Sequence, residues 1–205
     1  MNPAIQKYFE TVSKELNNNI DHVDMESLKK AASLILDSEA ASGRVHVCGI
    51  GKPSYVAGYI ASLLSSTGTS AYVLDGTEAV HGSSGQVKKN DVVIAISNSG
   101  ETAELKATVG ALTSNGAAII ACTGDASSWL ATHAEVCLLA HVEQEGDTLN
   151  KPPRASILSE IMILQSLSIL LQEAKKLSYD EYLKWHPGGS LGNSIRAMKE
   201  KEEHK

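Results

Sequence analysis

The sequence predicts an α/β protein, a three-layer αβα sandwich with a five-stranded parallel sheet, and three observations support this fold class. The apolar runs at 92–96 and 118–122 do not alternate with polar residues, which is typical of strands buried on both faces. Strand-like and helix-like segments alternate along the chain, as they do around a parallel sheet. Small and aliphatic residues predominate and aromatic residues make up only 4%, which suits closely packed helices and strands.

The individual elements are predicted in chain order from periodicity and from breaking residues. Apolar residues recur at helical spacing in two runs up to residue 38. A strand at 44–48 follows, and Pro53 fits the first turn of the next helix, where its missing N–H would have no partner. That helix ends at Gly68. Further strands are predicted at 71–74, 91–97, 117–122 and 135–139, and further helical segments at 103–114, 128–133 and 154–175.

The length of 205 residues favours one domain. We expect the helices of residues 1–40 to pack on the main part of that domain, residues 41–198. A charged tail is predicted at 199–205. The helix core at 157–172 is apolar on more than one face, so a monomer would expose a large patch. This predicts a homo-oligomer, and the alternative is a central helix buried within one subunit.

Charge and composition exclude several classes of protein. With 18 basic and 24 acidic residues, the net charge of −6 argues against a nucleic-acid partner. No segment approaches the run of about 20 apolar residues that a membrane span needs, and the charged N-terminal segment does not resemble a signal peptide. A cytoplasmic location is therefore expected. Cys48, Cys122 and Cys137 lie in apolar runs without metal or disulfide spacing, so we predict reduced thiols, no metal site and no cofactor.

The clearest candidate for a binding site is the loop 97–102, which follows a strand and precedes a helix. It contains Ser97, Asn98, Ser99, Gly100 and Thr102. Ligands of open α/β sheets bind at the carboxyl ends of strands, and a helix start offers unpaired N–H groups to an anion. Hydroxyl donors and a glycine that permits close approach therefore favour phosphate. On composition alone, an ordinary turn with Ser and Thr caps is equally consistent.

A second candidate loop, 49–52, also follows a strand and contains Gly49, Gly51 and Lys52. It is not a phosphate-binding Walker A motif, because His46 stands where the first glycine is required and Pro53 replaces the Ser or Thr. It also lacks the third glycine of a dinucleotide-binding fingerprint. Two interpretations remain. Either the tight turn places the lysine over the edge of the sheet where ligands bind, or the lysine is an ordinary solvated surface residue.

Two histidines have settings that distinguish them from the other five. His81 is expected in the loop after the second strand. His186 begins a His-Pro-Gly-Gly segment, whose stiff and then flexible backbone predicts a fixed loop.

Together, these segments resemble the sugar isomerase (SIS) domain family. The matching segments keep the family's order and spacing from about residue 40 to residue 195, and they are 49–52, 64–69, 78–82, 91–104 and 186–192. Within the family, the chain is most similar to the arabinose-5-phosphate isomerases, which interconvert ribulose 5-phosphate and arabinose 5-phosphate. The resemblance covers only the SIS domain, since the sequence ends before the position of the cystathionine-β-synthase-type modules that many relatives carry.

The resemblance implies a flavodoxin-like sheet, a sugar-phosphate ligand and usually a tetramer with sites at subunit boundaries. The positions that match the family's catalytic set are Lys52, Glu104, Glu145 and His186, with His81 lining the site. Ser97, Ser99 and Thr102 match the phosphate loop. The expected binding residues also include Gly49, Gly51, Asn98, Gly100 and Ser156.

Two departures from the family pattern bear on the substrate. The family usually has Ser-Gly-His after the lysine, whereas this chain has Pro-Ser-Tyr at 53–55. The segment 145–156 keeps Glu145 and Ser156 but replaces a run of threonines and introduces Arg154. We expect this arginine to hold a phosphate or to pair at a subunit contact.

The first functional hypothesis is an aldose–ketose isomerase that acts on a sugar phosphate through an enediol. Glu145 would be the base, and His186 would open the sugar ring or relay a proton. Lys52 would stabilise the oxyanion, and Glu104 would orient the substrate or share the proton transfer. The alternatives are a non-catalytic sugar-phosphate-binding regulatory protein and an isomerase of another pentose or hexose phosphate.

Overall fold

A computed structural model describes residues 1–188 and 192–194 of the chain. Parts of the motif at 186–192 and the whole predicted tail at 199–205 therefore lie outside the described residues. In chain order the elements are α1 (Pro3–Asp21), α2 (Met25–Ala40), β1 (Val45–Gly49), α3 (Lys52–Ser66), β2 (Ala71–Val73), α4 (Gly76–Ala79), the 3-10 helix η1 (Ser83–Gln86), β3 (Val92–Ile96), α5 (Ala103–Ser114), β4 (Ala118–Thr123), α6 (Trp129–Thr132), β5 (Val136–Leu139), α7 (Ala155–Ala174) and α8 (Tyr179–Trp185).

The strands β1 to β5 form a five-stranded sheet of order β2-β1-β3-β4-β5, with parallel pairing throughout. This confirms the predicted fold class. At the centre, β1 and β3 pair from Val45 opposite Val92 to Gly49 opposite Ile96. Because these two strands end level with each other, the loops that follow them leave the sheet at neighbouring positions.

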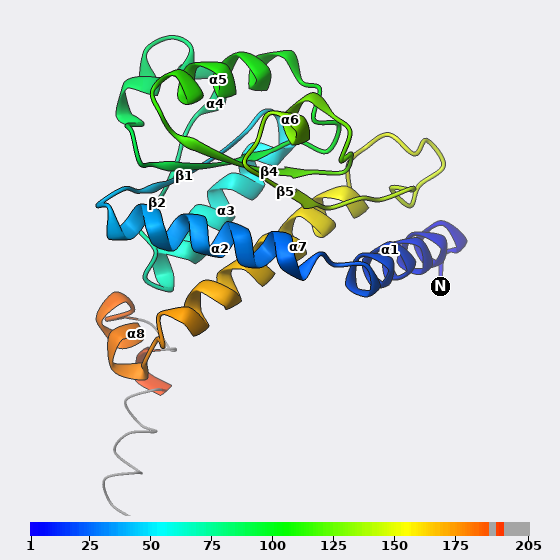
Figure 1. Cartoon of the computed structure of the whole chain (residues 1–205). Helices are drawn as coiled ribbons and strands as arrows, with labels where there is room; N and C mark the ends of the chain where they lie inside the picture. The colour runs from blue at the N-terminus through cyan, green and yellow to red at the C-terminus, as the bar shows by residue number, and fades with distance from the viewer. Residues whose placement is uncertain (189–191, 195–205) are drawn as a thin grey trace, which may run out of the picture.

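Helices cover both faces of the sheet, with α4, α5 and α6 on one face and α2, α3 and α7 on the other (Figure 1). Neighbouring residues of β3 pack into two different hydrophobic cores, one on each face of the sheet. Ile94 belongs to the core under α2, α3 and α7, whereas Val93 and Ala95 belong to the core under α4, α5 and α6. Burial on both faces explains why the strands show no alternation of polar and apolar residues.

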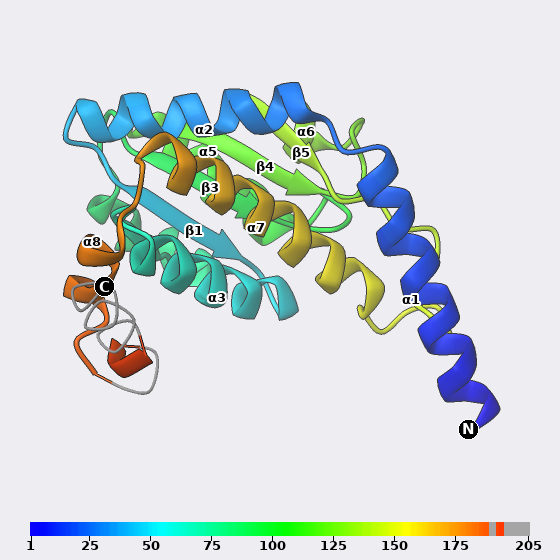
Figure 2. The same ribbon diagram turned by 90° about the horizontal axis from the view of Figure 1, so that it is seen from below.

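The helix α7 crosses the face that it shares with α2 and α3 (Figure 2). Contrary to the expectation from sequence that no segment approaches a membrane span, α7 is, within the described residues, a helix whose length and composition would also allow it to span a membrane. Half of its most apolar window is buried inside the fold, and Ile163, Leu164 and Leu167 of α7 belong to the core. This packing is typical of the core helix of an α/β domain. The helix α1 packs on α7 at the side of the sandwich.

Two short helices were not predicted from the sequence. In α4, the Asp75 side chain accepts hydrogen bonds from the N–H groups of Thr77 and Glu78. In α8, Ser178 and Glu181 form a capping box. Both helices are short and stabilised mainly at their ends, so the hydrophobic periodicity that reveals longer helices is missing.

Candidate active site

The order of the strands creates a ligand-binding position between β1 and β3. The strand β2 pairs on one side of β1 and β3 on the other, so the chain connections diverge from this point. Ligands of open parallel sheets bind at such a switch point, outside the carboxyl ends of the strands. The loops 49–52 and 97–102 follow β1 and β3 directly, and both therefore lie at this edge.

Two long helices begin at this edge without a capping side chain. The N-cap residues are Gly51 for α3 and Thr102 for α5, and neither makes a side-chain capping bond. Side chains do cap α1, α2, α4, α6 and α8. In α3, Pro53 has no N–H and the Ser54 N–H donates to the Gly51 carbonyl oxygen at 3.1 Å. The first N–H groups of α5 are open to a ligand at the positive end of the helix dipole, which favours an anion such as phosphate.

Ser97 and Gly100 fix the shape of the loop 97–102. The Ser97 hydroxyl accepts a hydrogen bond from the Gly100 N–H at 3.1 Å and lies 3.2 Å from Thr102 Oγ1. Gly100 has a φ of +63°, and a Cβ atom there would lie 2.1 Å from the hydroxyl that caps α6. Only glycine fits this position without displacing the neighbouring turn.

The other residues of this loop differ in exposure and in hydrogen bonding. Ser99 is exposed, whereas the half-buried Asn98 uses its carbonyl oxygen to accept a hydrogen bond from a backbone N–H at 2.9 Å. Hydrogen bonds from Lys106 and from the Trp129 N–H lower the pKa of Glu101. The negative charge of Glu101 is thus paired with Lys106. The exposed Ser99 hydroxyl accepts a hydrogen bond from the Glu101 N–H at 3.2 Å, which leaves its own O–H to donate to a ligand.

Gly49 and Gly51 shape the turn that leads to Lys52. A Cβ atom on Gly49 would lie 2.8 Å from the backbone of Pro53, and Gly51 has a φ of +67°. Pro53 occupies the first turn of α3, which confirms its predicted place. Lys52 is the first residue of α3 and is exposed, so its ammonium group is free to reach a ligand at the sheet edge.

Glu104 and His81 are both exposed. Glu104 lies in the first turn of α5, where the positive end of the helix dipole stabilises a carboxylate. His81 was expected in the loop after β2, and it follows the short helix α4 within that connection. Their roles at the site stay predictions.

Glu145 is a buried carboxylate, only 8% exposed. Its Oε2 atom accepts hydrogen bonds from the N–H groups of Arg154 at 2.6 Å and of Ser156 at 3.1 Å. These N–H groups belong to the start of α7, which has no side-chain cap from its own N-cap residue. Glu143, the acidic residue two positions earlier, is exposed. Glu145 is therefore a fixed group and not a solvated loop charge.

The helix α1 holds the segment that carries Glu145. The buried Glu15 accepts a hydrogen bond at Oε2 from the Glu143 N–H at 3.0 Å. Asn19 Nδ2 donates to the His141 carbonyl oxygen at 2.7 Å. These supports were not predicted from the sequence, where they appear only as two polar residues four positions apart on a helix.

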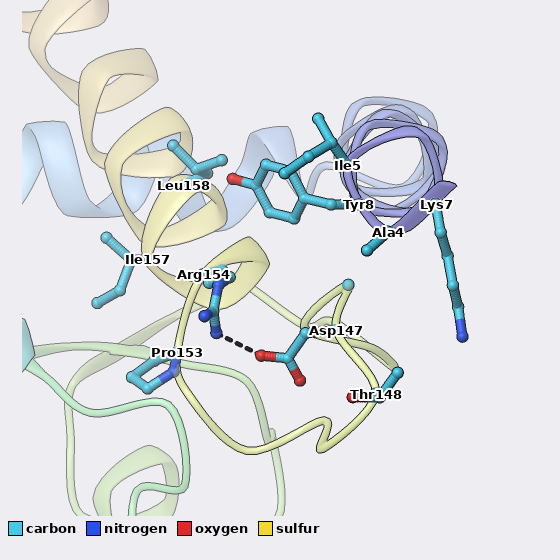
Figure 3. A pocket seen from close by; sticks show the side chains of 11 residues that line it. Ala4, Ile5, Lys7, Tyr8, Asp147, Thr148, Pro153, Arg154, Ile157 and Leu158 are labelled. Carbon is cyan, nitrogen blue, oxygen red and sulfur yellow. Dashed lines mark hydrogen bonds and ion pairs between the residues drawn. The ribbon is translucent and has the colours of Figure 1, made fainter. Parts of the chain in front are cut away.

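A cleft of about 550 Å³ lies between α1, the start of α7 and the loop 146–154 (Figure 3). Tyr8 packs against Gly146, where a Cβ atom would lie 2.9 Å from the Tyr8 ring. In the same cleft Arg154 forms an ion pair with Asp147. The guanidinium expected to hold a phosphate or a subunit contact is therefore paired within its own chain.

A smaller cavity of about 290 Å³ joins the starts of α3 and α7. Lys52 and Pro153 both line it, and Pro153 directly precedes the residue whose N–H binds Glu145. The fold thus brings Lys52 close to the segment that holds Glu145, although the two are distant in sequence. Tyr55 lines the same cavity and is 81% exposed.

Ser156 contributes to this region through its backbone. Its side chain is fully buried, and its hydroxyl has no hydrogen-bond partner. Its N–H binds Glu145, as described above. The predicted contact between Ser156 and substrate stays a prediction.

His186 lies at the opposite edge of the sheet in the same chain. The Trp185 ring lies against Gly68, just before β2, and Figure 2 shows β1 pointing away from α8. The His186 ring stacks on Tyr182 at a centroid distance of 3.9 Å, with Nδ1 2.9 Å from the Tyr182 carbonyl oxygen. Because a carbonyl oxygen only accepts, Nδ1 carries a proton and Nε2 of the neutral ring has a free lone pair. A site with both Lys52 and His186 needs two copies of the chain.

The part of the chain that the structure describes contains no cluster of three or more His, Cys, Asp or Glu placed to hold a metal. Cys48, Cys122 and Cys137 are free thiols. Burial raises the pKa of the Cys48 thiol to about 12, so it stays protonated in the core.

Comparison with known proteins gives the family. A profile described as SIS domain matches residues 40–170. This chain belongs to the SIS domain family. The match spans β1 to most of α7, the part of the fold that carries the loops 49–52 and 97–102 and the segment with Glu145.

Curated relatives of this SIS domain are named arabinose 5-phosphate isomerase KdsD. The protein from Francisella tularensis is 35% identical over 198 residues, which cover 95% of this chain and 59% of the relative. The protein from Pseudomonas aeruginosa is 40% identical over 166 residues, or 81% of this chain and 50% of the relative. The chain thus spans between half and three fifths of the length of these relatives.

A solved structure of a relative has the same fold. It is the Escherichia coli CFT073 protein c3406 in complex with arabinose 5-phosphate, which is 34% identical with a TM-score of 0.80. The similarity covers 89% of this chain and 95% of that one. These comparisons confirm the resemblance from sequence and the fold class.

Replacing Ser99 and Thr102 together by Ala is expected to weaken sugar-phosphate binding by several-fold to about a hundredfold. One hydrogen bond to a charged group contributes about 1.5–3 kcal/mol. Because Thr102 Oγ1 already lies 3.2 Å from Ser97 Oγ, we expect the double variant to lose no more than about one such bond, and the uncapped start of α5 supplies the remaining donors. Titration calorimetry measures the affinity. Ser114→Ala, at the other end of α5, is the matched control. An unchanged affinity in the double variant would show that phosphate binds elsewhere.

Proposed function

We propose that this SIS domain is an aldose–ketose isomerase of sugar phosphates that interconverts D-ribulose 5-phosphate and D-arabinose 5-phosphate. The observation that carries the proposal is the buried carboxylate of Glu145 on the same side of the sheet as the hydroxyl-rich loop 97–102 and the uncapped start of α5. A base together with a phosphate site is what this isomerisation requires. The names of the relatives and the sugar-phosphate complex of the Escherichia coli protein favour the pentose phosphate.

The reaction moves hydrogen between two adjacent carbons of the open-chain sugar. Glu145 takes a proton from the carbon beside the carbonyl group, and the electrons of that C–H bond form an enediolate. The Lys52 ammonium stabilises the negative oxygen, and Glu104 orients the substrate or shares the transfer of the hydroxyl proton. Glu145 then returns its proton to the neighbouring carbon. No electrons leave the substrate, so no external oxidant is needed.

We assign the opening of the sugar ring, or a proton relay, to His186 of a second copy. Its Nε2 atom has the free lone pair that this role requires. The surface also favours association, because Ile169 of α7 is 56% exposed and Tyr55 and Tyr59 of the adjoining helix α3 are exposed as well. We therefore propose a homo-oligomer, most simply a tetramer, that acts in the cytoplasm.

One observation favours a second candidate function, a non-catalytic sensor of sugar phosphates. The Oε2 atom of Glu145 closes the start of α7, and this structural role would by itself account for a buried carboxylate. In that case the loop 97–102 would still bind phosphate, but no group would remove a proton from carbon.

A panel of pentose and hexose phosphates tests both candidates. Each compound is incubated with the protein, and isomerisation and the shift in melting temperature are measured. We expect ribulose 5-phosphate and arabinose 5-phosphate to interconvert and to stabilise the protein. Stabilisation without turnover would favour the sensor, and turnover of only a hexulose 6-phosphate would change the substrate.

A further inference from the structure

The carboxyl group of Glu160 is isolated inside the core. Glu160 lies on α7, its side chain is 0% exposed, and neither of its oxygens has a hydrogen-bond partner. None of the ion pairs in the described part of the chain includes it. An ionised carboxylate without partners is strongly disfavoured in such surroundings, so this group stays protonated in the fold.

Glu160 lies next to the segment that holds Glu145. Ser156, whose N–H donates to Glu145 Oε2 at 3.1 Å, precedes Glu160 by four residues and therefore lies on the same face of α7. The hydroxyls of Ser156 and Ser159 are also buried without partners. Farther along the same face, Ile163 is the first of a run of apolar core residues. Ser168 is also buried on this face, and its hydroxyl lies 3.5 Å from that of Thr67. The buried polar side chains of α7 that lack a partner are thus those at its start, beside the candidate site.

The charges near Glu160 come from few groups. Burial, together with the negative charge of Glu145, raises the pKa of Glu160 to about 8. On the sheet side, burial holds the pKa of the Cys122 thiol well above its usual range, and Glu160 adds to this effect. Because Cys122 stays neutral, the two carboxyl groups determine the net charge of this cluster.

We propose that Glu160 is a positioning residue for the candidate base: it stays a neutral acid, so that the two neighbouring carboxyl groups carry one negative charge, on Glu145. This role rests on the proposed function of Glu145. Glu160 takes no proton from the substrate. Its effect is electrostatic, because a second negative charge beside Glu145 would oppose both an anionic sugar phosphate and the enediolate formed from it.

The first measurement tests the protonation of Glu160 without using activity. In the pH range between its usual value of 4.5 and about 8, folded Glu160 keeps a proton that the unfolded chain releases. The stability of the wild-type protein therefore falls as the pH rises through this range. The melting temperatures of Glu160→Gln and Glu160→Leu should not show the decrease with rising pH that Glu160 causes. The control Glu143→Gln, at an exposed site, should show the same decrease as the wild-type protein.

The second measurement tests the link to the base. In the wild-type protein, kcat/KM should fall by about tenfold per pH unit above about pH 8 as Glu160 ionises. In Glu160→Gln this alkaline limb should disappear, and in Glu143→Gln it should remain. Glu160→Leu, which also carries no charge, provides a second variant if the Gln side chain disturbs the core.

Two results would overturn the proposal. Identical pH dependence of melting temperature in all variants would show that Glu160 is not a neutral acid in the fold. A changed stability profile with an unchanged alkaline limb of kcat/KM would show a neutral acid that has no influence on the base. If no sugar phosphate is turned over, the stability profiles still report on Glu160, so this failure of the proposed function is distinguishable from an error about its protonation.

Discussion

Replacing Glu145 by Gln is expected to lower kcat by a factor of about 10² to 10⁴, the usual loss when a general base is removed. Gln keeps an oxygen that accepts the hydrogen bonds from the N–H groups of Arg154 and Ser156, so the start of α7 remains capped. It lacks the carboxylate that would take the proton from carbon. The measurement is kcat and substrate affinity on the best substrate of the panel, with the melting temperature as a check on folding.

Glu143→Gln is the matched control for this variant. Its side chain is exposed, and the contact with Glu15 is made by the Glu143 backbone N–H, which the substitution keeps. Its kcat should therefore be close to that of the wild-type protein. If Glu145→Gln folds normally and retains nearly full kcat, the base lies elsewhere and Glu104 is the next candidate.

The placement of His186 leads to an equally large expected effect. Lys52→Ala and His186→Ala should each lose most activity, because each removes a group from every site. If a site takes its lysine from one copy and its histidine from another, mixed oligomers of the two variants regain complete sites. With random assortment of two variants, about a quarter of the sites have both residues.

Activity assays of coexpressed variants measure this recovery, and light scattering measures the oligomeric state. The double variant Lys52→Ala/His186→Ala, coexpressed with either single variant, is the control, since each of these mixtures lacks one of the two residues in every copy and cannot form a complete site. A monomer at micromolar concentration, or mixed oligomers without recovered activity, would contradict a site built from two copies.

The regular elements of the sandwich were largely predictable from local sequence. The strands β1, β3 and β4 appear as short apolar runs because both faces of a parallel sheet are buried. The long helices α5 and α7 match their predicted ranges within one residue at each end. The short helices α4 and α8 escaped prediction because side-chain caps, and for α8 the contact of Trp185 with Gly68, stabilise them more than periodic burial does.

The candidate site was predictable in part for a topological reason. In a parallel sheet the carboxyl ends of all strands lie at one edge, so residues just after predicted strands are brought to the same side. This reasoning predicts that Lys52 and the loop 97–102 lie at one edge. Glu145, which the family resemblance indicates, follows the predicted strand 135–139 and so belongs to the same edge. It could not place His186, because the position of α8 depends on how the chain folds back after α7.

The sequence by itself determined the αβα architecture, the family and the loops that carry Lys52, Ser99 and Thr102, since periodicity and turn residues act locally. Only the tertiary structure decided that Glu145 is buried as the cap of α7, that α1 supports its segment, and that His186 and Lys52 lie at opposite edges of the sheet. These features depend on which helix faces meet across the fold. The isolation of Glu160 has the same origin, because an acidic residue on an apolar helix becomes a buried acid only when that face packs on the sheet.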